Sequence, residues 1–338
     1  MVGINTDKTV FSKEVRERYE KIYGLVGNHS GVQICTWTKK AMRGKGVCYK
    51  QKFYGASCFG CCQMSPALAW CEENCIFCWR PMEWMKQTEM KNVDDPEEII
   101  KGCVEQRKRL LSGIGGAEDT DQEAFKKSFN EFPCHWAISL SGEPTLYPKL
   151  GELVKLLKSK KEVKTIFIVT NGQEPEKIKE LADQNALPTQ LYVSLVASNE
   201  ALFKKINRSN YKDGWEKLNQ TLEIMPKLKC RRVIRLTLIK GMNDDSKFMK
   251  EFATLVEKSK TDFVEVKSYM FLGLSRQRLK KENMPYYEDM KQWSEKFITV
   301  LGNGDHPQNY EIVNEDKSSR IFLLKRKDSK YPDIIDEK

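Results

Sequence analysis

The cysteines are crowded into one short part of the chain, and this crowding is the strongest constraint on what the chain can fold into. The sequence of 338 residues contains 11 cysteines, and eight of them lie between positions 35 and 78. Hydrophobic residues make up 40% of the chain, enough to bury a sizeable core without disulfides. Clustered thiols in such a chain favour ligation of a metal ion or an iron–sulfur cluster. The stretch 31–90 also shows little periodicity, as expected of a segment that is ordered by something other than a core.

Charge and hydropathy narrow the class of protein further. The chain carries 57 Lys+Arg against 47 Asp+Glu, a formal net charge of +10, which favours a polyanionic partner. It has no apolar run near the roughly 18 residues that a membrane span requires, and no apolar signal region at its start. We therefore expect a cytoplasmic protein without membrane association. We also expect a monomer.

Short apolar runs alternate with segments of helical period over most of the chain. This alternation predicts βαβ units and therefore an α/β fold with a mostly parallel sheet. Binding sites in such sheets form at the carboxyl ends of the strands. We expect six strands, at 66–70, 136–140, 165–170, 191–196, 233–239 and 263–269, and a terminal hairpin at 310–313 and 321–324.

Three other segments are assigned from local signals. Residues 1–30 resemble a polar helical lead-in. A helix is predicted over 96–112, with Pro96 at its first position. The acidic, Gly-rich stretch 113–131 is predicted to be an exposed excursion.

The sharpest motif is a C-x3-C-x2-C triplet formed by Cys71, Cys75 and Cys78. Three thiolates can hold three irons of a 4Fe–4S cluster and leave the fourth iron open, which is what a catalytic site needs. With the aromatic Trp79 directly after it, the triplet resembles the radical S-adenosylmethionine (SAM) superfamily. That resemblance implies a partial (β/α)6 TIM-like barrel, in which the open iron chelates the amino and carboxylate groups of SAM.

Zinc is the alternative metal that these thiols could bind. The pairs Cys58–Cys61 and Cys75–Cys78 both have C-x2-C spacing, which is typical of zinc ribbons. A zinc ribbon would leave Cys71 without a role and would not account for the predicted sheet. The corresponding alternative function is a zinc-stabilised RNA-binding module.

Motifs at the predicted strand ends match the superfamily. The segment 139–145 resembles its "GEP" turn, in which Gly permits a close approach and Pro fixes the turn. Each of these groups could also be an ordinary strand terminus. The resemblance implies SAM contacts from Ser141, Gly142, Glu143, Pro144, Thr170, Asn171, Gly172 and Ser194.

Further segments resemble one family, the archaeal 4-demethylwyosine synthases. The resemblance covers about residues 30–325 and is carried by the segments 35–40, 46–55, 63–66, 78–81 and 265–279. It implies a second 4Fe–4S cluster on Cys35, Cys48 and Cys61, with an open iron that chelates pyruvate. The departures from the family are the acidic insert 113–131 and the extra thiols Cys58 and Cys62, which leave Cys61 or Cys62 open as the third ligand.

The family implies a reaction. Its members add two carbons from pyruvate to the N1-methylated guanosine 3′ of the anticodon of phenylalanine tRNA and close a third ring. Lys50 matches the family lysine that forms a Schiff base with pyruvate; the alternative is that Lys50 contacts a phosphate in a basic loop. A radical SAM enzyme acting on a peptide or small molecule is the other alternative. We expect an external electron donor such as ferredoxin or flavodoxin.

Basic residues suggest where the anticodon loop binds. One run covers 39–52 and contains no acidic residue, and aromatic residues lie among its basic ones, which suits phosphate contacts with base stacking. A charge run can equally be a solvated face. The other predicted contacts are Arg231, Arg232, Arg235, Arg276, Arg278, Lys280 and Lys281. The expected domains are an N-terminal extension with the second cluster (1–64), the barrel (65–305) and a C-terminal hairpin and tail (306–338).

Overall fold

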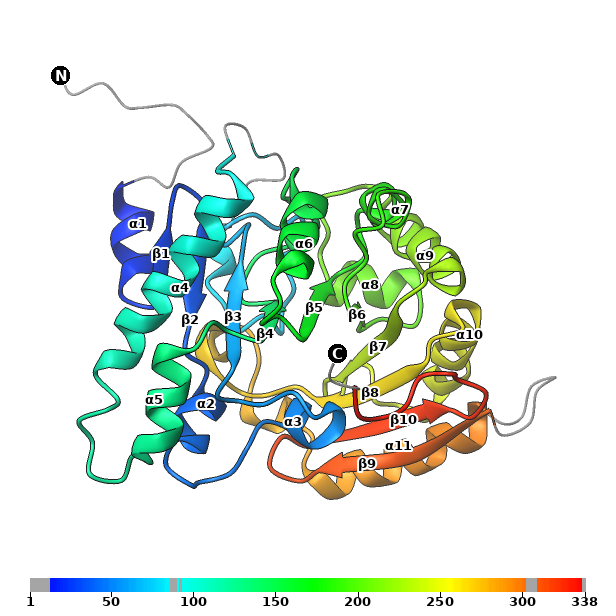
Figure 1. Ribbon diagram of the computed structural model, residues 1–338. Coiled ribbons are helices and arrows are strands. Elements are labelled where there is room, and N and C mark those ends of the chain that lie inside the picture. The colour runs from blue at the N-terminus through cyan, green and yellow to red at the C-terminus, as the bar shows by residue number, and fades with distance from the viewer. Residues whose placement is uncertain (1–12, 86–89, 91–92, 302–308, 336–338) are drawn as a thin grey trace.

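Six parallel strands form the centre of a ten-stranded sheet that is not closed into a full barrel (Figure 1). The computed structural model describes residues 13–85, 90, 93–301 and 309–335. Each central strand pairs in parallel with the next one along the chain. These strands are β3 (Cys61–Ser65), β4 (His135–Ile138), β5 (Thr165–Thr170), β6 (Gln190–Leu195), β7 (Arg231–Leu238) and β8 (Phe263–Ser268). The predicted partial (β/α)6 barrel is therefore confirmed.

Antiparallel strands extend both edges of this sheet. At one edge, β1 (Gly24–Val26) pairs with β2 (Ser30–Gln33), which pairs with β3. At the other edge, β10 (Ile321–Arg326) pairs with β8 and with β9 (Tyr310–Asp316). The predicted terminal hairpin is confirmed. The domain boundary expected at 305/306 lies outside the described residues, and the three-domain division stays a prediction.

Helices cover the outer face of the curved sheet (Figure 1). The predicted helix over 96–112 is confirmed, with Pro96 in its first turn and Asp95 at its N-cap. No helix in the described ranges is long and apolar enough to cross a membrane. The connecting helices are α4 (Pro96–Ser112), α6 (Leu150–Ser159), α7 (Pro175–Asp183), α8 (Glu200–Ile206), α9 (Gly214–Ile224), α10 (Met249–Ser259) and α11 (Tyr287–Leu301).

The inner face of the sheet has its own core. Because side chains alternate along a strand, Phe167 and Tyr192 point inward while their neighbours pack against the outer helices. The short helix α3 (Tyr49–Tyr54) packs its aromatic residues onto this inner face. The C-terminal tail joins it, since Ile335 N donates to the carbonyl of Tyr54 at 3.1 Å.

The strand predicted at 66–70 is wrong. The first parallel strand is β3, five residues earlier, and 66–70 is a buried turn in which Leu68 N bonds the carbonyl of His29. A short apolar run is buried in either conformation, so its composition did not distinguish a strand from a turn.

Two segments before the barrel also differ from expectation. The stretch 113–131 is not simply an exposed excursion, because it contains α5 (Gln122–Asn130), capped by the side chain of Asp121. Phe125 of α5 packs against a small core that includes Met42. The lead-in forms α1 (Lys13–Glu20) and then β1 and β2, while residues 1–12 lie outside the described part.

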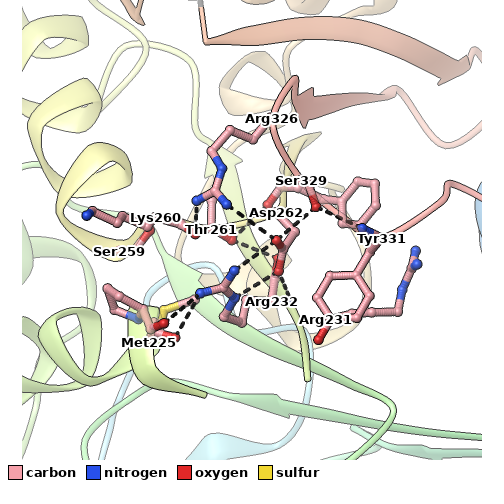
Figure 2. Close-up of polar contacts among 12 residues, drawn as sticks. Met225, Arg231, Arg232, Ser259, Lys260, Thr261, Asp262, Arg326, Ser329 and Tyr331 are labelled. Atoms are coloured by element: carbon pink, nitrogen blue, oxygen red, sulfur yellow. Dashed lines mark hydrogen bonds and ion pairs between the residues drawn. The ribbon is translucent and has the colours of Figure 1, made fainter. Parts of the chain in front are cut away.

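The prediction that the three arginines of β7 contact tRNA phosphates is wrong. Arg231 and Arg232 are 4% and 8% exposed, and Arg232 makes a bidentate ion pair with Asp262 at 2.8 and 2.9 Å (Figure 2). The same carboxylate accepts a hydrogen bond from Ser329. Arg235 also points inward and pairs with the buried Glu265 at 2.8 Å. These arginines tie β7 to β8 and to the C-terminal tail.

Candidate active site

The C-x3-C-x2-C triplet lies in the loop that follows β3, at the carboxyl edge of the sheet. This loop is tied to the segment after α8, since Asn74 N and Ile76 N donate to the carbonyls of Asn207 and Ile206 at 3.1 and 3.0 Å. These bonds fix the loop across the top of the parallel strands. We refer to residues 71–78 as the triplet loop.

The three thiols of the triplet loop lie close enough to influence one another. Burial raises the pKa of Cys75 well above its usual value, and nearby carboxyl and thiol groups, including Cys71 and Cys78, raise it further. The Cys75 thiol donates to the carboxylate of Glu73 at 2.9 Å. A metal cluster that takes up three thiolates would relieve this desolvation, so the chemistry of the group fits an iron–sulfur cluster.

Arg278 supports the triplet loop through hydrogen bonds to its backbone. Its guanidinium donates to the carbonyl of Ile76 at 3.1 Å and to that of Cys78, and it pairs with Glu83. The sequence predicted a phosphate contact here, and the structure instead places Arg278 in the support of the loop.

The GEP turn lies against the triplet loop. Gly142 has φ 69°, and a Cβ at that position would lie 1.9 Å from the carbonyl oxygen of Ala67, so only glycine fits. Glu143 N donates to the carbonyl of Trp70 at 2.7 Å. These contacts bring the predicted SAM-binding turn beside the start of the triplet loop, with Pro144 opening a short 3-10 turn.

Two of the predicted strand ends meet at Glu143. Its carboxylate accepts hydrogen bonds from Asn171 N at 2.8 Å and from the backbone and hydroxyl of Thr145 at 3.0 and 2.6 Å. The amide of Asn171 lies 4.0 Å from the sulfur of Cys71. Thr170 and Gly172 flank Asn171 on the same turn, with the Thr170 hydroxyl accepting from Gly172 N at 3.0 Å.

The other two predicted SAM residues are placed differently. Ser141 is buried directly before the GEP turn. Ser194 is half-buried on β6 and pairs in register with Arg235. Among the described residues, no hydrogen bond joins Ser194 to the group around Glu143.

A buried acidic residue was missed by the sequence reasoning. Within the described residues, both carboxylate oxygens of Glu72 are buried without a hydrogen-bond partner. Burial and then the neighbouring Glu143 raise the pKa of Glu72 well above its usual value. A buried carboxyl group without a partner is costly unless a ligand satisfies it, so this site suits a cationic molecule such as SAM.

A second group of thiols lies at the opposite end of β3. Cys35, Cys48, Cys58 and Cys61 line one cavity together with Lys50; we call it the thiol cavity. Cys61 is the first residue of β3, whereas the triplet loop follows its last. With a rise of roughly 3.3 Å per residue, the strand separates the two ends by roughly 13 Å.

Local structure directs these thiols into the cavity. Cys35 and Cys48 are the N-cap residues of α2 (Thr36–Ala41) and α3. Burial, followed by the nearby Cys35, raises the pKa of Cys61 well above its usual value. Cys62 is fully buried on the other face of β3, where it contacts Cys103 of α4.

The alternative zinc ribbon is not formed. Cys58 and Cys61 line the thiol cavity, whereas Cys75 and Cys78 belong to the triplet loop at the other end of β3.

Lys50 extends from α3 onto two inward-facing aromatic rings. Its Nζ lies 4.6 Å from the centre of the Phe167 ring and 5.0 Å from that of Tyr192. Burial lowers the pKa of Lys50, and the nearby Arg235 lowers it further. A lysine in this environment keeps more of its amine neutral, as imine formation requires.

Sequence reasoning also missed Lys267, a lysine of β8 whose pKa is influenced by Cys48, one of the residues of the thiol cavity. It lies on β8 over the ring of Tyr49 at 5.2 Å, and burial lowers its pKa to about 8. The signal was available, because Glu265 and Lys267 are two residues apart on a strand and therefore point to the same face.

The basic run 39–52 does not form one face. Arg43 and Lys45 pair with Asp119, and α2 lies beside the start of β3 (Figure 1), while Lys50 points inward. The carboxyl edge instead carries three exposed apolar residues: Trp79, Leu272 and Tyr286 are 46%, 43% and 50% exposed. We call them the edge surface.

Arginine side chains lie next to the aromatic rings of the edge surface. The guanidinium of Arg80 lies 3.6 Å from the centre of the Trp79 ring, and that of Arg320 lies 4.7 Å from the ring of Tyr286. Arg276 is exposed nearby, over the ring of Phe271. Aromatic rings next to arginines at the mouth of a barrel suit stacked bases and phosphates.

Comparison with known proteins agrees with this geometry. Residues 66–253 match the family model "Radical SAM superfamily", and residues 258–326 match "Wyosine base formation". An S-adenosyl-L-methionine-dependent tRNA 4-demethylwyosine synthase from Pyrococcus horikoshii is 44% identical over 94% of this chain and 90% of its own. A protein of the same name from Methanocaldococcus jannaschii is 36% identical over 93% and 95%.

Solved structures give the same result. A structure of TYW1 with a lysine–pyruvate adduct bound has a TM-score of 0.80 and 33% identity, covering 95% of this chain and 98% of that one. A crystal structure of archaeal TYW1 has a TM-score of 0.74 and 30% identity, covering 95% and 99%. The chain therefore belongs to the tRNA 4-demethylwyosine synthase family of the radical SAM superfamily.

Proposed function

We propose that this chain is the enzyme that converts the N1-methylated guanosine 3′ of the anticodon of phenylalanine tRNA to 4-demethylwyosine, with pyruvate as the two-carbon donor. The observation that carries the proposal is that two separate sets of cysteines, the triplet loop and the thiol cavity, lie at the two ends of β3. Relatives of this activity match nearly the whole chain.

The triplet loop would hold the radical cluster. Cys71, Cys75 and Cys78 would ligate three irons, and the cluster when bound supplies the reductive cleavage of SAM. Glu143 and the turn at Asn171 would orient the amino acid part of SAM at the carboxyl edge. Glu72 would lie opposite its positive charge, which accounts for a buried carboxyl group with no hydrogen-bond partner among the described residues.

The thiol cavity would hold the second cluster and pyruvate. Cys35, Cys48 and Cys61 would be its ligands, and Cys61 is favoured over Cys62 because only Cys61 lines the cavity. Lys50 would attack the keto carbon of pyruvate, lose water and form an imine. The lowered pKa of Lys50 supports this role, as does the similar structure of TYW1 with a lysine–pyruvate adduct bound.

The anticodon loop would bind at the edge surface. Trp79 follows Cys78 directly, so a base stacked on its ring would lie next to the radical cluster. Arg276 and Arg320 would neutralise nearby phosphates. The target guanosine would then enter the barrel between the two thiol groups, as an unstacked base.

Three further parts belong to the proposal: a ferredoxin or flavodoxin as electron donor, a monomeric state and a cytoplasmic location. The proposed cofactors are tested by purifying the protein without oxygen. We expect a brown protein with iron and sulfide for two clusters, which releases deoxyadenosine when SAM and a reductant are added. A colourless protein that contains zinc would contradict the proposal.

A further inference from the structure

Cys58 is a fourth thiol in the thiol cavity, and the proposed function does not use it. The residue is 2% exposed and lines the cavity with Cys35, Cys48 and Cys61. The sequence identifies Cys58 as a departure from the family pattern, so the family's ligand set gives it no role.

The backbone holds Cys58 in a fixed turn next to Cys61. Cys58 N donates to the side-chain oxygen of Gln51 at 2.9 Å, and the Cys58 carbonyl accepts from the Thr38 hydroxyl at 3.2 Å and from Cys61 N at 3.4 Å. The two cysteines therefore form a tight C-x2-C turn. Cysteines at this spacing commonly bind one metal centre, because the turn directs both sulfurs to the same point.

The sulfur of Cys58 is also tied to another cysteine of the cavity. Cys48 N donates to Cys58 Sγ at 3.1 Å. This sulfur therefore lies beside a proposed ligand and is already oriented by it.

We propose that Cys58 is a fourth sulfur ligand of the second cluster, which occupies the open coordination position until pyruvate replaces it. The inference rests on the second cluster of the proposed function. On replacement, one iron–sulfur bond breaks, oxygen atoms of pyruvate take the position, and the released thiolate takes up a proton from solvent. No atom changes its oxidation state.

The consequence is that, without substrate, every coordination position of the second cluster is occupied by a protein ligand. A site with four protein ligands has no open position for water or oxygen, whereas three ligands leave one. If the closed form is about nine-tenths populated, it weakens the apparent affinity for pyruvate roughly tenfold.

Mössbauer spectroscopy of the second cluster alone tests the proposal. The parent for the test is the full chain with Cys71→Ala, Cys75→Ala and Cys78→Ala, reconstituted with iron and sulfide. We expect all irons of the parent to have sulfur ligands only, and one iron per cluster to gain oxygen ligands when pyruvate is added. Adding Cys58→Ala should give that distinct iron before pyruvate is present, and should tighten pyruvate binding about tenfold.

The controls separate the possible failures. Cys62→Ala should leave the spectrum of the parent unchanged, because Cys62 lies on the other face of β3. Cys58→Ser keeps the size of the side chain and should behave as Cys58→Ala does. Identical spectra of the parent and Cys58→Ala without pyruvate would overturn the proposal, as would loss of the cluster from both Cys58 variants. A folded parent that holds no iron would instead reject the second cluster itself.

Discussion

The amine of Lys50 and the ring of Phe167 are 4.6 Å apart, although one residue comes from a helix before the barrel and the other from the third parallel strand. This contact places the lysine inside the barrel. It also removes the amine from bulk water and brings it beside the thiol cavity. The proposed reaction of Lys50 with pyruvate would therefore take place on the inner face of the sheet.

The pH dependence of imine trapping follows from this burial. The folded-state pKa of Lys50 lies below the ordinary 10.5, with burial as the main cause, so the neutral amine forms at lower pH than in a free lysine. Anaerobic incubation with pyruvate and borohydride should trap an adduct on Lys50, with a yield that rises with pH through a midpoint below 10.5. A midpoint at or above 10.5 would contradict the burial of the amine.

The two clusters should be separable by single substitutions. Cys75→Ala removes one of three ligands at the triplet loop, so we expect lower iron content and no deoxyadenosine. Cys48→Ala should also lower the iron content, but deoxyadenosine should still form while the tricyclic nucleoside is lost. Iron analysis and chromatography of both products provide the measurement. Normal deoxyadenosine from Cys75→Ala would reject the assignment of the triplet.

Substitutions of Arg278 and Arg276 should have different effects, although the two residues are only two positions apart. Arg278→Met removes the bonds to the carbonyls of Ile76 and Cys78, so it should loosen the triplet loop and reduce both cluster iron and deoxyadenosine. Arg276→Glu should spare both and weaken tRNA binding, with a flatter dependence of affinity on salt. Equal cluster content in the two variants would show that Arg278 does not support the loop.

Trp79 should contribute to tRNA binding by stacking. Base–aromatic stacking is worth about 1–3 kcal/mol, so Trp79→Ala should weaken binding of the methylated tRNA by roughly 5- to 150-fold. Trp79→Phe should restore part of this loss. Ile334→Ala is the matched control, since Ile334 is 51% exposed in the C-terminal tail, away from the carboxyl edge. Affinity unchanged in Trp79→Ala would exclude the edge surface as the binding face.

The sequence predicted most of the barrel because its strands are apolar runs bounded by turns. β5 begins and ends where the run 165–170 does, and β8 differs by one residue. β3 was missed because its sequence, with two cysteines, a glutamine and a serine, lacks an apolar run. Its position is fixed by pairing with β2 and β4.

Spacing in the sequence predicted two segments that the structure brings together, the triplet and the GEP turn; their roles stay predictions. The site was not predictable where a charge is neutralised by a distant residue. Arg232 and Arg235 each lie 30 positions from the carboxylate that pairs with them, Asp262 and Glu265, so a sequence window shows only a basic patch. The difference between Cys61 and Cys62 depends on which face of β3 each side chain occupies, and this was unknown until the strand was placed.

The most direct test of the proposed activity is the product of the whole reaction in the native protein and in Lys50→Arg. Each is incubated without oxygen with tRNA carrying N1-methylguanosine, isotope-labelled pyruvate, SAM and a reductant, and the nucleosides are then analysed by mass spectrometry. We predict that the native protein gives a tricyclic nucleoside with two labelled carbons. Lys50→Arg keeps the charge but cannot form the imine, so it should bind the tRNA and give no such product. Normal turnover by Lys50→Arg, or a native product without label, would contradict the account.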